Sequence, residues 1–139
     1  MELIIDGSLF KIDFWDTGVP HAVIFVDELQ DTNVEKIGNA IRYHAHFKPT
    51  GTNTNFVRVI DRGKIRIRTY ERGVEAETLA CGTGAIASAS ASNYRGFTDA
   101  DLKVEVALPD VLEISLKNGY ERPTLAGYVV ESFKGEIEV

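Results

Sequence analysis

The stretch at residues 78–96, TLACGTGAIASASASNYRG, decides the fold of this chain. It contains the single cysteine, Cys81, and after the following Gly-Thr-Gly almost every side chain is small. Alanine is the strongest helix former, so we predict about three turns of helix here, ended by Arg95 with Gly96 as the C-cap residue. No charge lies between Glu77 and Arg95. Because a helix without a charged face is usually buried, strands should pack around it from several sides.

The start of this helix is the candidate reactive site. Unpaired backbone N–H groups and the helix dipole attract anions there, and they favour the thiolate form of a cysteine. Cys81 could therefore act as a base, with a ligand carboxylate docked beside it. The alternative is an inert, packed cysteine. Gly82 and Gly84 around Thr83 favour the functional interpretation, because glycine lets a backbone approach a ligand oxyanion.

Length and composition indicate one domain spanning residues 1–139. Of the 139 residues, 44% are hydrophobic and 26% charged, which is typical of a globular protein with its own core. The net charge of −6 argues against a nucleic acid or an anionic membrane as partner. A lone cysteine rules out an internal disulfide, and the opening MELIIDGSLF does not read as a signal peptide. We expect a cytoplasmic protein.

No metal site is expected. His44 and His46 lie two residues apart, which places them on different sides of a helix. The sequence has no other group of histidine, cysteine and carboxylate residues at the spacing of metal ligands.

Hydrophobic periodicity predicts an α+β fold: a mixed or antiparallel sheet wrapped around one central helix of small residues, with one peripheral helix. The peripheral, amphipathic helix should cover residues 33–46, with Asp31 or Thr32 as its N-cap. Residues 49–55, PTGTNTN, read as a turn-rich loop. Strands are predicted at 2–5 and 9–15, forming a hairpin, and at 23–26, 56–60, 64–70, 102–108, 111–116, 125–133 and, briefly, 137–139.

Four polar positions stand out against this framework, each with a structural alternative. His21 follows a Gly/Pro turn at the entrance of a buried strand, where a hydrogen-bonded structural histidine is the commoner case. Asn53 lies in the turn-rich loop, where such side chains often cap their own backbone. Glu71 and Arg72 lie between a strand end and the Cys81 helix, either as a weak surface ion pair or as part of a functional loop.

Four segments in this order resemble the second half of the diaminopimelate epimerases, a family of pyridoxal-independent amino-acid epimerases. They are TGVPHAVIFV at 17–26, FKPTGTNTNFV at 47–57, RTYERG at 68–73 and ETLACGTGAIAS at 77–88. The resemblance implies a fold of two pseudo-symmetric halves, each a sheet curled around a helix, with the active site between them. It implies no cofactor. One cysteine from each half would flank the α-carbon of the substrate, one removing a proton and the other delivering one.

The same resemblance implies roles for individual residues. Catalytic roles fall to Cys81, His21 and Glu71. Substrate-binding roles fall to Asn53, Glu71, Arg72, Gly82 and Thr83, with Gly82 and Thr83 at the α-carboxylate. The chain departs from the family at Val19, where some members carry asparagine, in the spacer at 74–76, and in lacking the first half with its cysteine.

We therefore expect the C-terminal catalytic domain of a diaminopimelate epimerase, which interconverts LL- and meso-diaminopimelate in lysine and peptidoglycan biosynthesis. Two alternatives remain open: a related racemase or isomerase of another amino acid, as in proline racemases and phenazine-biosynthesis isomerases, or a non-catalytic domain that kept the fold. The expected partners are a small amino acid and either the missing N-terminal half or a second copy in a two-fold homodimer.

Overall fold

The computed structural model describes residues 1–79, 81–107 and 110–127 and contains two α-helices, α1 (Val34–Arg42) and α2 (Gly82–Tyr94), and a short 3-10 helix, Ala45–Phe47. The strands are β1 (Glu2–Ile5), β2 (Ser8–Lys11), β3 (Asp13–Asp16), β4 (Pro20–Phe25), β5 (Asn53–Asp61), β6 (Lys64–Glu71), β7 (Ala76–Thr78), β8 (Asp101–Glu105), β9 (Val111–Ser115) and β10 (Thr124–Ala126).

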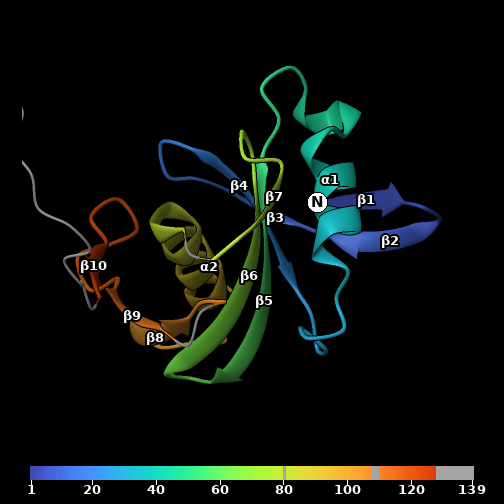
Figure 1. Ribbon diagram of the computed structural model, residues 1–139. Helices are drawn as coiled ribbons and strands as arrows, with labels where there is room; N and C mark the ends of the chain where they lie inside the picture. Colours follow the sequence, from blue (N-terminus) through green and yellow to red (C-terminus); the bar gives the residue numbers. More distant parts are fainter. Residues whose placement is uncertain (80, 108–109, 128–139) are drawn as a thin grey trace, which may run out of the picture.

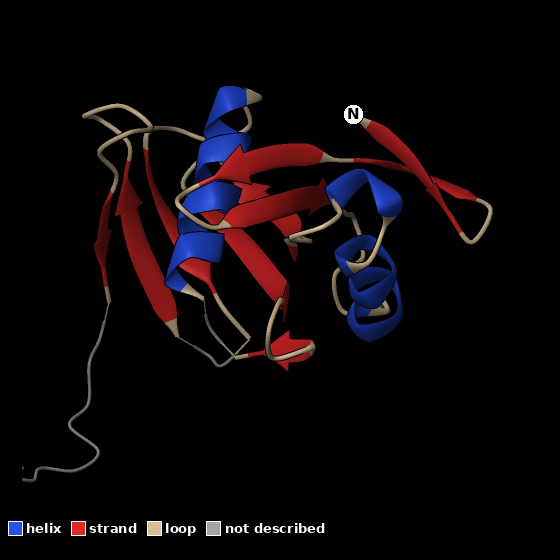
Figure 2. Cartoon of the chain, turned by 90° about the horizontal axis from the view of Figure 1, so that it is seen from above, coloured by secondary structure: helices blue, strands red, loops and turns tan. Residues whose placement is uncertain are grey.

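Eight of these strands form one curved sheet in the order β10-β9-β8-β6-β5-β4-β3, with β7 pairing with β6 (Figure 1). The pairs β4–β5 and β6–β8 are parallel, and the other pairs are antiparallel. Strands β1 and β2 make a separate hairpin that projects from the rest (Figure 2). The predicted mixed sheet is confirmed.

The two helices lie on opposite faces of the sheet, so the sheet separates two hydrophobic cores (Figure 1). Alternate strand residues point to opposite faces. Val23 and Val57 therefore belong to the core against α2, whereas Ala22 and Phe56 belong to the core against α1. The central helix and the peripheral helix of the expected fold are both present.

Helix α2 begins where it was predicted, with Cys81 as its N-cap. Its C-cap is Arg95 and not Gly96; Gly96 follows directly with a φ of 79°, in the left-handed region that glycine tolerates best. Most of the helix is buried, because its alanine and serine side chains let β4, β5, β6, β8 and β9 approach. The prediction of a buried helix of small residues is confirmed.

Helix α1 differs from the prediction at both ends. Its N-cap is Asn33, whose side chain accepts a hydrogen bond from the Lys36 N–H, and not Asp31 or Thr32. It ends at Arg42, since His44 is extended (φ −61°, ψ 141°) and its ring accepts a hydrogen bond from the N–H of His46. The expected helix to residue 46 therefore breaks into α1 and a 3-10 turn.

Several strand boundaries also differ. The predicted strand 9–15 is interrupted at the buried Ile12, so that β2 stays in the hairpin while β3 joins the main sheet. The strand that was expected from residue 56 already begins at Asn53, which removes Asn53 and Asn55 from the predicted loop. Strand β7 was not predicted. The predicted strand at 137–139 and parts of those at 102–108 and 125–133 lie outside the described residues.

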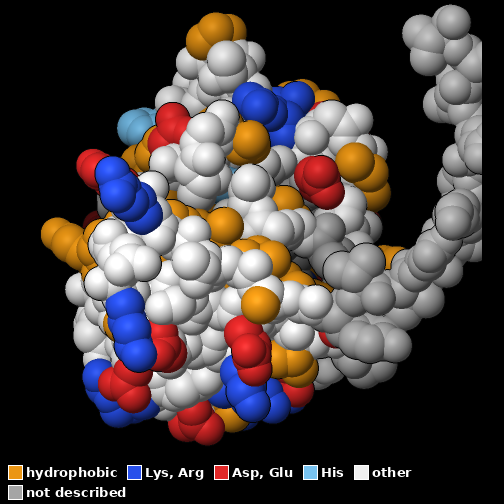
Figure 3. Space-filling view, turned by 90° about the vertical axis from the view of Figure 1, so that its left-hand side faces the viewer, with side chains coloured by type: hydrophobic (Ala, Val, Ile, Leu, Met, Phe, Trp, Pro, Cys, Tyr) orange, Lys and Arg blue, Asp and Glu red, His pale blue; other side chains and the backbone are white. Residues whose placement is uncertain are grey.

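The surface carries charges of both signs. Figure 3, which shows the side of α2 and β10, has hydrophobic side chains exposed over its middle, between basic and acidic ones. No helix within the described ranges is long and apolar enough to cross a membrane.

Candidate active site

The sheet face against α2 changes from apolar to polar along its central strands. By strand alternation, His21 shares this face with Val23 in β4, and Asn55 shares it with Val57 in β5. Thr69 of β6 pairs directly with Asn55. His21, Asn55 and Thr69 are at most 3% exposed. Three neighbouring strands thus bury polar side chains at one end of the core, next to α2.

Cys81 lies at the start of α2, with its sulfur turned towards the first turn of the helix. Its Sγ accepts a hydrogen bond from the Gly84 N–H at 3.4 Å and lies 3.4 Å from the Thr83 hydroxyl. Cys81 is half-buried. A donated N–H bond and the helix dipole both stabilise negative charge on the sulfur.

A chain of side-chain hydrogen bonds leads from β6 to this cysteine. Thr69 Oγ1 donates to Asn55 Oδ1 at 2.8 Å, and Asn55 Nδ2 lies 2.8 Å from His21 Nδ1. On the other side of the ring, His21 Nε2 lies 3.0 Å from Thr83 Oγ1, which contacts Cys81. The structure thus brings His21, Thr83 and Cys81 together, and it adds Asn55 and Thr69, which the sequence analysis did not select as site residues.

His21 is neutral at physiological pH. Burial is the main reason that its pKa falls from 6.5 to about 4; the negative charge of Asp16 opposes this shift, and the positive charge of Arg72 adds to it. A neutral imidazole donates from one ring nitrogen and accepts at the other. His21 therefore acts on its neighbours through hydrogen bonds and not as a cation.

The remaining predicted residues gather around the end of β6. Asn53 Oδ1 accepts the backbone N–H of Arg72 at 2.6 Å, and Arg72 Nη1 donates to the Thr50 carbonyl at 3.1 Å. Glu71 is half-buried and follows Thr69 on the face towards α2. The structure therefore links Asn53 to Arg72 and connects the Arg72 guanidinium to the loop before β5.

Gly82, the first residue of α2, is exposed, and Thr83 is half-buried behind it. The Thr83 hydroxyl contacts His21 and Cys81, so the backbone N–H is the group of Thr83 that is left to bind a ligand. The strand alternation that places Asn55 two residues before Val57 was visible in the sequence. Assigning residues 49–55 to a loop concealed it.

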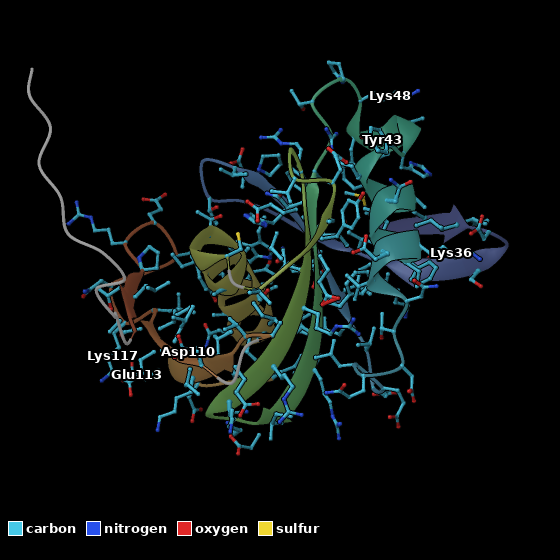
Figure 4. The ribbon with its side chains drawn as sticks, viewed as in Figure 1. Lys36, Tyr43, Lys48, Asp110, Glu113 and Lys117 are labelled. Atoms are coloured by element: carbon cyan, nitrogen blue, oxygen red, sulfur yellow. The ribbon has the colours of Figure 1, made fainter. Side chains whose placement is uncertain are left out.

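Cys81 opens onto a small crevice, and the larger hollows lie elsewhere on the described surface. The crevice is too narrow to hold a water molecule and is lined by side chains of β6 and β7 and by Leu79, Val106 and Ala107. One larger hollow lies among β8, β9 and β10, on the side where Figure 4 shows Glu113 and Lys117; Lys36 and Tyr43 lie on the far side, with α1. Within the described residues, no group of three or more histidine, cysteine and acidic residues could hold a metal ion.

Comparison with known proteins gives one family. The sequence model of the family described as diaminopimelate epimerase matches residues 14–129. A diaminopimelate epimerase of Hydrogenobaculum sp. is 44% identical over 99% of this chain and 50% of its own length. The enzyme of that name from Aquifex aeolicus is 43% identical over 97% of this chain and 49% of its own length. The chain spans about half the length of these curated relatives.

Solved structures share the fold at low sequence identity. A probable proline racemase from Agrobacterium radiobacter matches with a TM-score of 0.60 and 17% identity, over 90% of this chain and 44% of the other. A phenazine biosynthesis protein of the PhzF family from Bacillus anthracis matches with a TM-score of 0.54 and 23% identity, over 79% and 36%. The similarity supports the sheet-around-a-helix architecture.

Proposed function

Since the chain belongs to the diaminopimelate epimerase family, we propose that it supplies one thiol of a two-thiol epimerase site and acts in the interconversion of LL- and meso-diaminopimelate, a step of lysine biosynthesis. On this proposal the chain corresponds to the C-terminal domain of a two-domain enzyme and works in the cytoplasm without a cofactor. The observation that carries the proposal is Cys81 as the N-cap of α2, half-exposed and hydrogen-bonded by Gly84.

The proposed reaction begins with Cys81 as a thiolate. Its sulfur takes the proton from the α-carbon, so that an S–H bond forms, the C–H bond breaks, and the electron pair is delocalised into the α-carboxylate. The backbone N–H groups of Gly82 and Thr83 at the helix start stabilise the charge that develops on the carboxylate. A thiol on the opposite face then delivers a proton to the carbon. Two thiols are needed because one base reaches only one face.

The polar residues around β6 would recognise the rest of the substrate. With its oxygen held by the Arg72 N–H, the Asn53 side chain keeps its Nδ2 group for a ligand. Arg72 supplies a positive charge and Glu71 a negative one, which suits an amino acid with a charged group at its distal end. We propose that His21 acts on the Cys81 thiol through the Thr83 hydroxyl. We propose a catalytic or substrate-binding role for Glu71 at the same site.

A second surface would complete the site. Leu79 and Leu125 are 59% and 42% exposed, and both lie beside the start of α2: Leu79 lines the crevice at Cys81, and Leu125 is the nearest side chain to Gly82. Exposed apolar side chains next to a reactive group suggest a surface that another domain covers. We propose an N-terminal half as that cover, or a second copy in its absence.

Reconstitution tests this function. The chain is mixed with the N-terminal half of the Aquifex aeolicus relative, and deuterium uptake at the α-carbon of LL-diaminopimelate and formation of the meso isomer are followed in heavy water. We expect turnover from the mixture and none from Cys81→Ala. Arg62→Lys, on an exposed turn, is the control and is expected to keep the activity.

The outcomes separate the alternatives. Absence of turnover and of diaminopimelate binding by the mixture would contradict the proposed substrate. Exchange of the α-proton of proline, but not of diaminopimelate, would favour a racemase of a small cyclic amino acid. Calorimetry without heat for any amino acid, combined with a Cys81 that does not react with iodoacetamide at neutral pH, would favour a non-catalytic domain.

A further inference from the structure

The buried hydrogen-bond chain behind Cys81 has a direction, and Asn55 sets it. Asn55 Nδ2 is a donor only, so the His21 Nδ1 atom that it meets at 2.8 Å must be the acceptor nitrogen. In a neutral ring the proton is then on Nε2, which faces Thr83 Oγ1 at 3.0 Å. With its oxygen accepting from His21, the Thr83 hydroxyl is free to donate to the Cys81 sulfur.

We infer that Asn55, held by Thr69, is a positioning residue. It orients the hydrogen bonds of His21 and Thr83 so that the Thr83 hydroxyl donates to the Cys81 sulfur. Hydrogen bonds to the charged form of a group favour that form, so the chain stabilises the thiolate. It also acts after proton transfer. Thr83 and Gly84 both donate to the sulfur, so an S–H proton finds no acceptor in the chain and points towards the ligand.

The packing keeps Asn55 in this position. Asn55 and His21 are fully buried, Thr69 is 3% exposed, and Asn55 Oδ1 accepts from the Thr69 hydroxyl at 2.8 Å. The same oxygen lies against Gly84, where a Cβ atom would come within 2.5 Å of it. The charged groups that act on the ring are Asp16 of β3 and Arg72, and burial outweighs both in keeping His21 neutral.

The catalytic meaning of this inference rests on the proposed function, but the direction of the hydrogen bonds can be measured on the chain alone. Long-range ¹H–¹⁵N NMR identifies the tautomer of His21, and the signals are assigned by their loss in His21→Gln. We expect the Nε2–H tautomer at pH 7. An Nδ1–H tautomer, or a doubly protonated ring, would overturn the inference.

Substitutions then test whether the direction of these hydrogen bonds affects the reactivity of the Cys81 sulfur. Asn55→Asp offers only acceptors, so it should move the ring proton to Nδ1 and slow alkylation of Cys81 by iodoacetamide at pH 7 about tenfold, as loss of a hydrogen bond to a charged group predicts. Thr83→Val should slow alkylation similarly while the tautomer stays Nε2–H, and Thr83→Ser should restore the rate. An unchanged alkylation rate in Thr83→Val would contradict the coupling.

Thr69→Val and Thr54→Val form a matched pair without a change of charge. Thr69 anchors Asn55, whereas the Thr54 hydroxyl, buried on the same sheet, has no partner within the described residues. We expect slower alkylation in Thr69→Val alone, and equal rates in the two variants would contradict the role of Asn55. If Asn55→Asp does not fold, the inference is still tested by the alkylation rates of these two threonine variants and by the tautomer of His21 in the wild type. If reconstitution gives no turnover while the tautomer and the alkylation rates are as expected, the proposed function is rejected and the positioning role of Asn55 is kept.

Discussion

At the scale of single residues, the most unusual group is a histidine that stays neutral far below its ordinary pKa. Burial lowers the pKa of His21 to about 4, and two side chains, Asn55 and Thr83, satisfy its ring nitrogens. A buried polar ring is tolerated because both nitrogens have partners. Protonation would place an N–H group on Nδ1, opposite the Asn55 Nδ2 donor, so acid should disrupt this site directly.

The shift makes stability depend on pH. The unfolded chain binds a proton at His21 below about pH 6.5, whereas the folded chain does so only near pH 4. Stability is therefore complete above pH 6.5 and falls as the pH drops towards 4. We expect His21 to account for about 2 kcal/mol of the loss in unfolding free energy between pH 7 and pH 5.

Urea unfolding at both pH values measures this contribution. In His21→Gln the loss between pH 7 and pH 5 should be smaller than in the wild type by that amount. Equal losses in the two proteins would show that the histidine is not buried in its neutral form.

At the scale of elements, the start of α2 is built on two glycines with different surroundings. A Cβ at position 84 would lie 2.5 Å from Asn55 Oδ1 and 3.3 Å from Cys81 Sγ, whereas a Cβ at position 82 would meet only Leu125, at 3.8 Å. Gly84 therefore permits β5 to approach the helix. Gly82 leaves the backbone open on the ligand side.

Alanine at each position separates these roles. Gly84→Ala should destabilise the fold by about 1–3 kcal/mol, because overpacking forces Asn55 or the helix to move. Gly82→Ala should change stability by no more than about 0.5 kcal/mol, as for an exposed position. Chemical denaturation measures both. A neutral Gly84→Ala would mean that α2 and β5 are not in close contact.

Strand β6 is held to its surroundings by the side chain of Arg68. Its Nε and Nη2 donate to Glu77 at 2.8 and 2.7 Å, and Nη1 donates to the Leu29 and Thr32 carbonyls at 2.9 and 3.1 Å. One guanidinium thus joins β6 to β7 and to the loop before α1. An ammonium group cannot reproduce this planar set of donors.

Arg68→Lys should therefore lower the unfolding free energy by about 1–2 kcal/mol. Arg62→Lys is the matched control, because the Arg62–Asp99 pair is more than half exposed and such pairs contribute little. Urea unfolding of both variants is the measurement. Equal stability of the two would place Arg68 among ordinary surface arginines.

At the scale of the whole molecule, the proposed site has only one of its two sides. Leu79 and Leu125 remain exposed beside α2, and this chain is about half as long as its curated relatives. On our proposal a second domain covers this surface. Without it, two copies should pair around a two-fold axis that brings their Cys81 residues towards each other.

Light scattering tests the assembly. We expect a dimer at tens of micromolar and a one-to-one complex once the N-terminal half of the Aquifex aeolicus relative is added. Leu79→Lys should weaken both associations, because it places a charge in the covered surface. Ile60→Lys, at an exposed position near the opposite end of β5, should not. A strict monomer, or equal effects of the two substitutions, would contradict this arrangement.

The sequence by itself determined the parts of this protein that depend on local interactions. The small residues and the flanking Arg95 and Gly96 specified α2 and its end, and alternation specified most of the strands. Cys81 at the helix start followed from the same stretch. The N-cap Asn33 and the early start of β5 at Asn53 were missed, because several neighbouring residues could equally have capped the helix or formed a turn.

Only the tertiary structure decided which polar side chains meet behind the cysteine. His21, Asn55 and Thr69 lie on three strands, and their contact depends on a parallel β4–β5 pairing and on the β5–β6 register. A shift of one residue in either register would turn Asn55 away from α2. Pairing between distant strands is set by the packing of both cores, so the order of residues along the chain leaves it open.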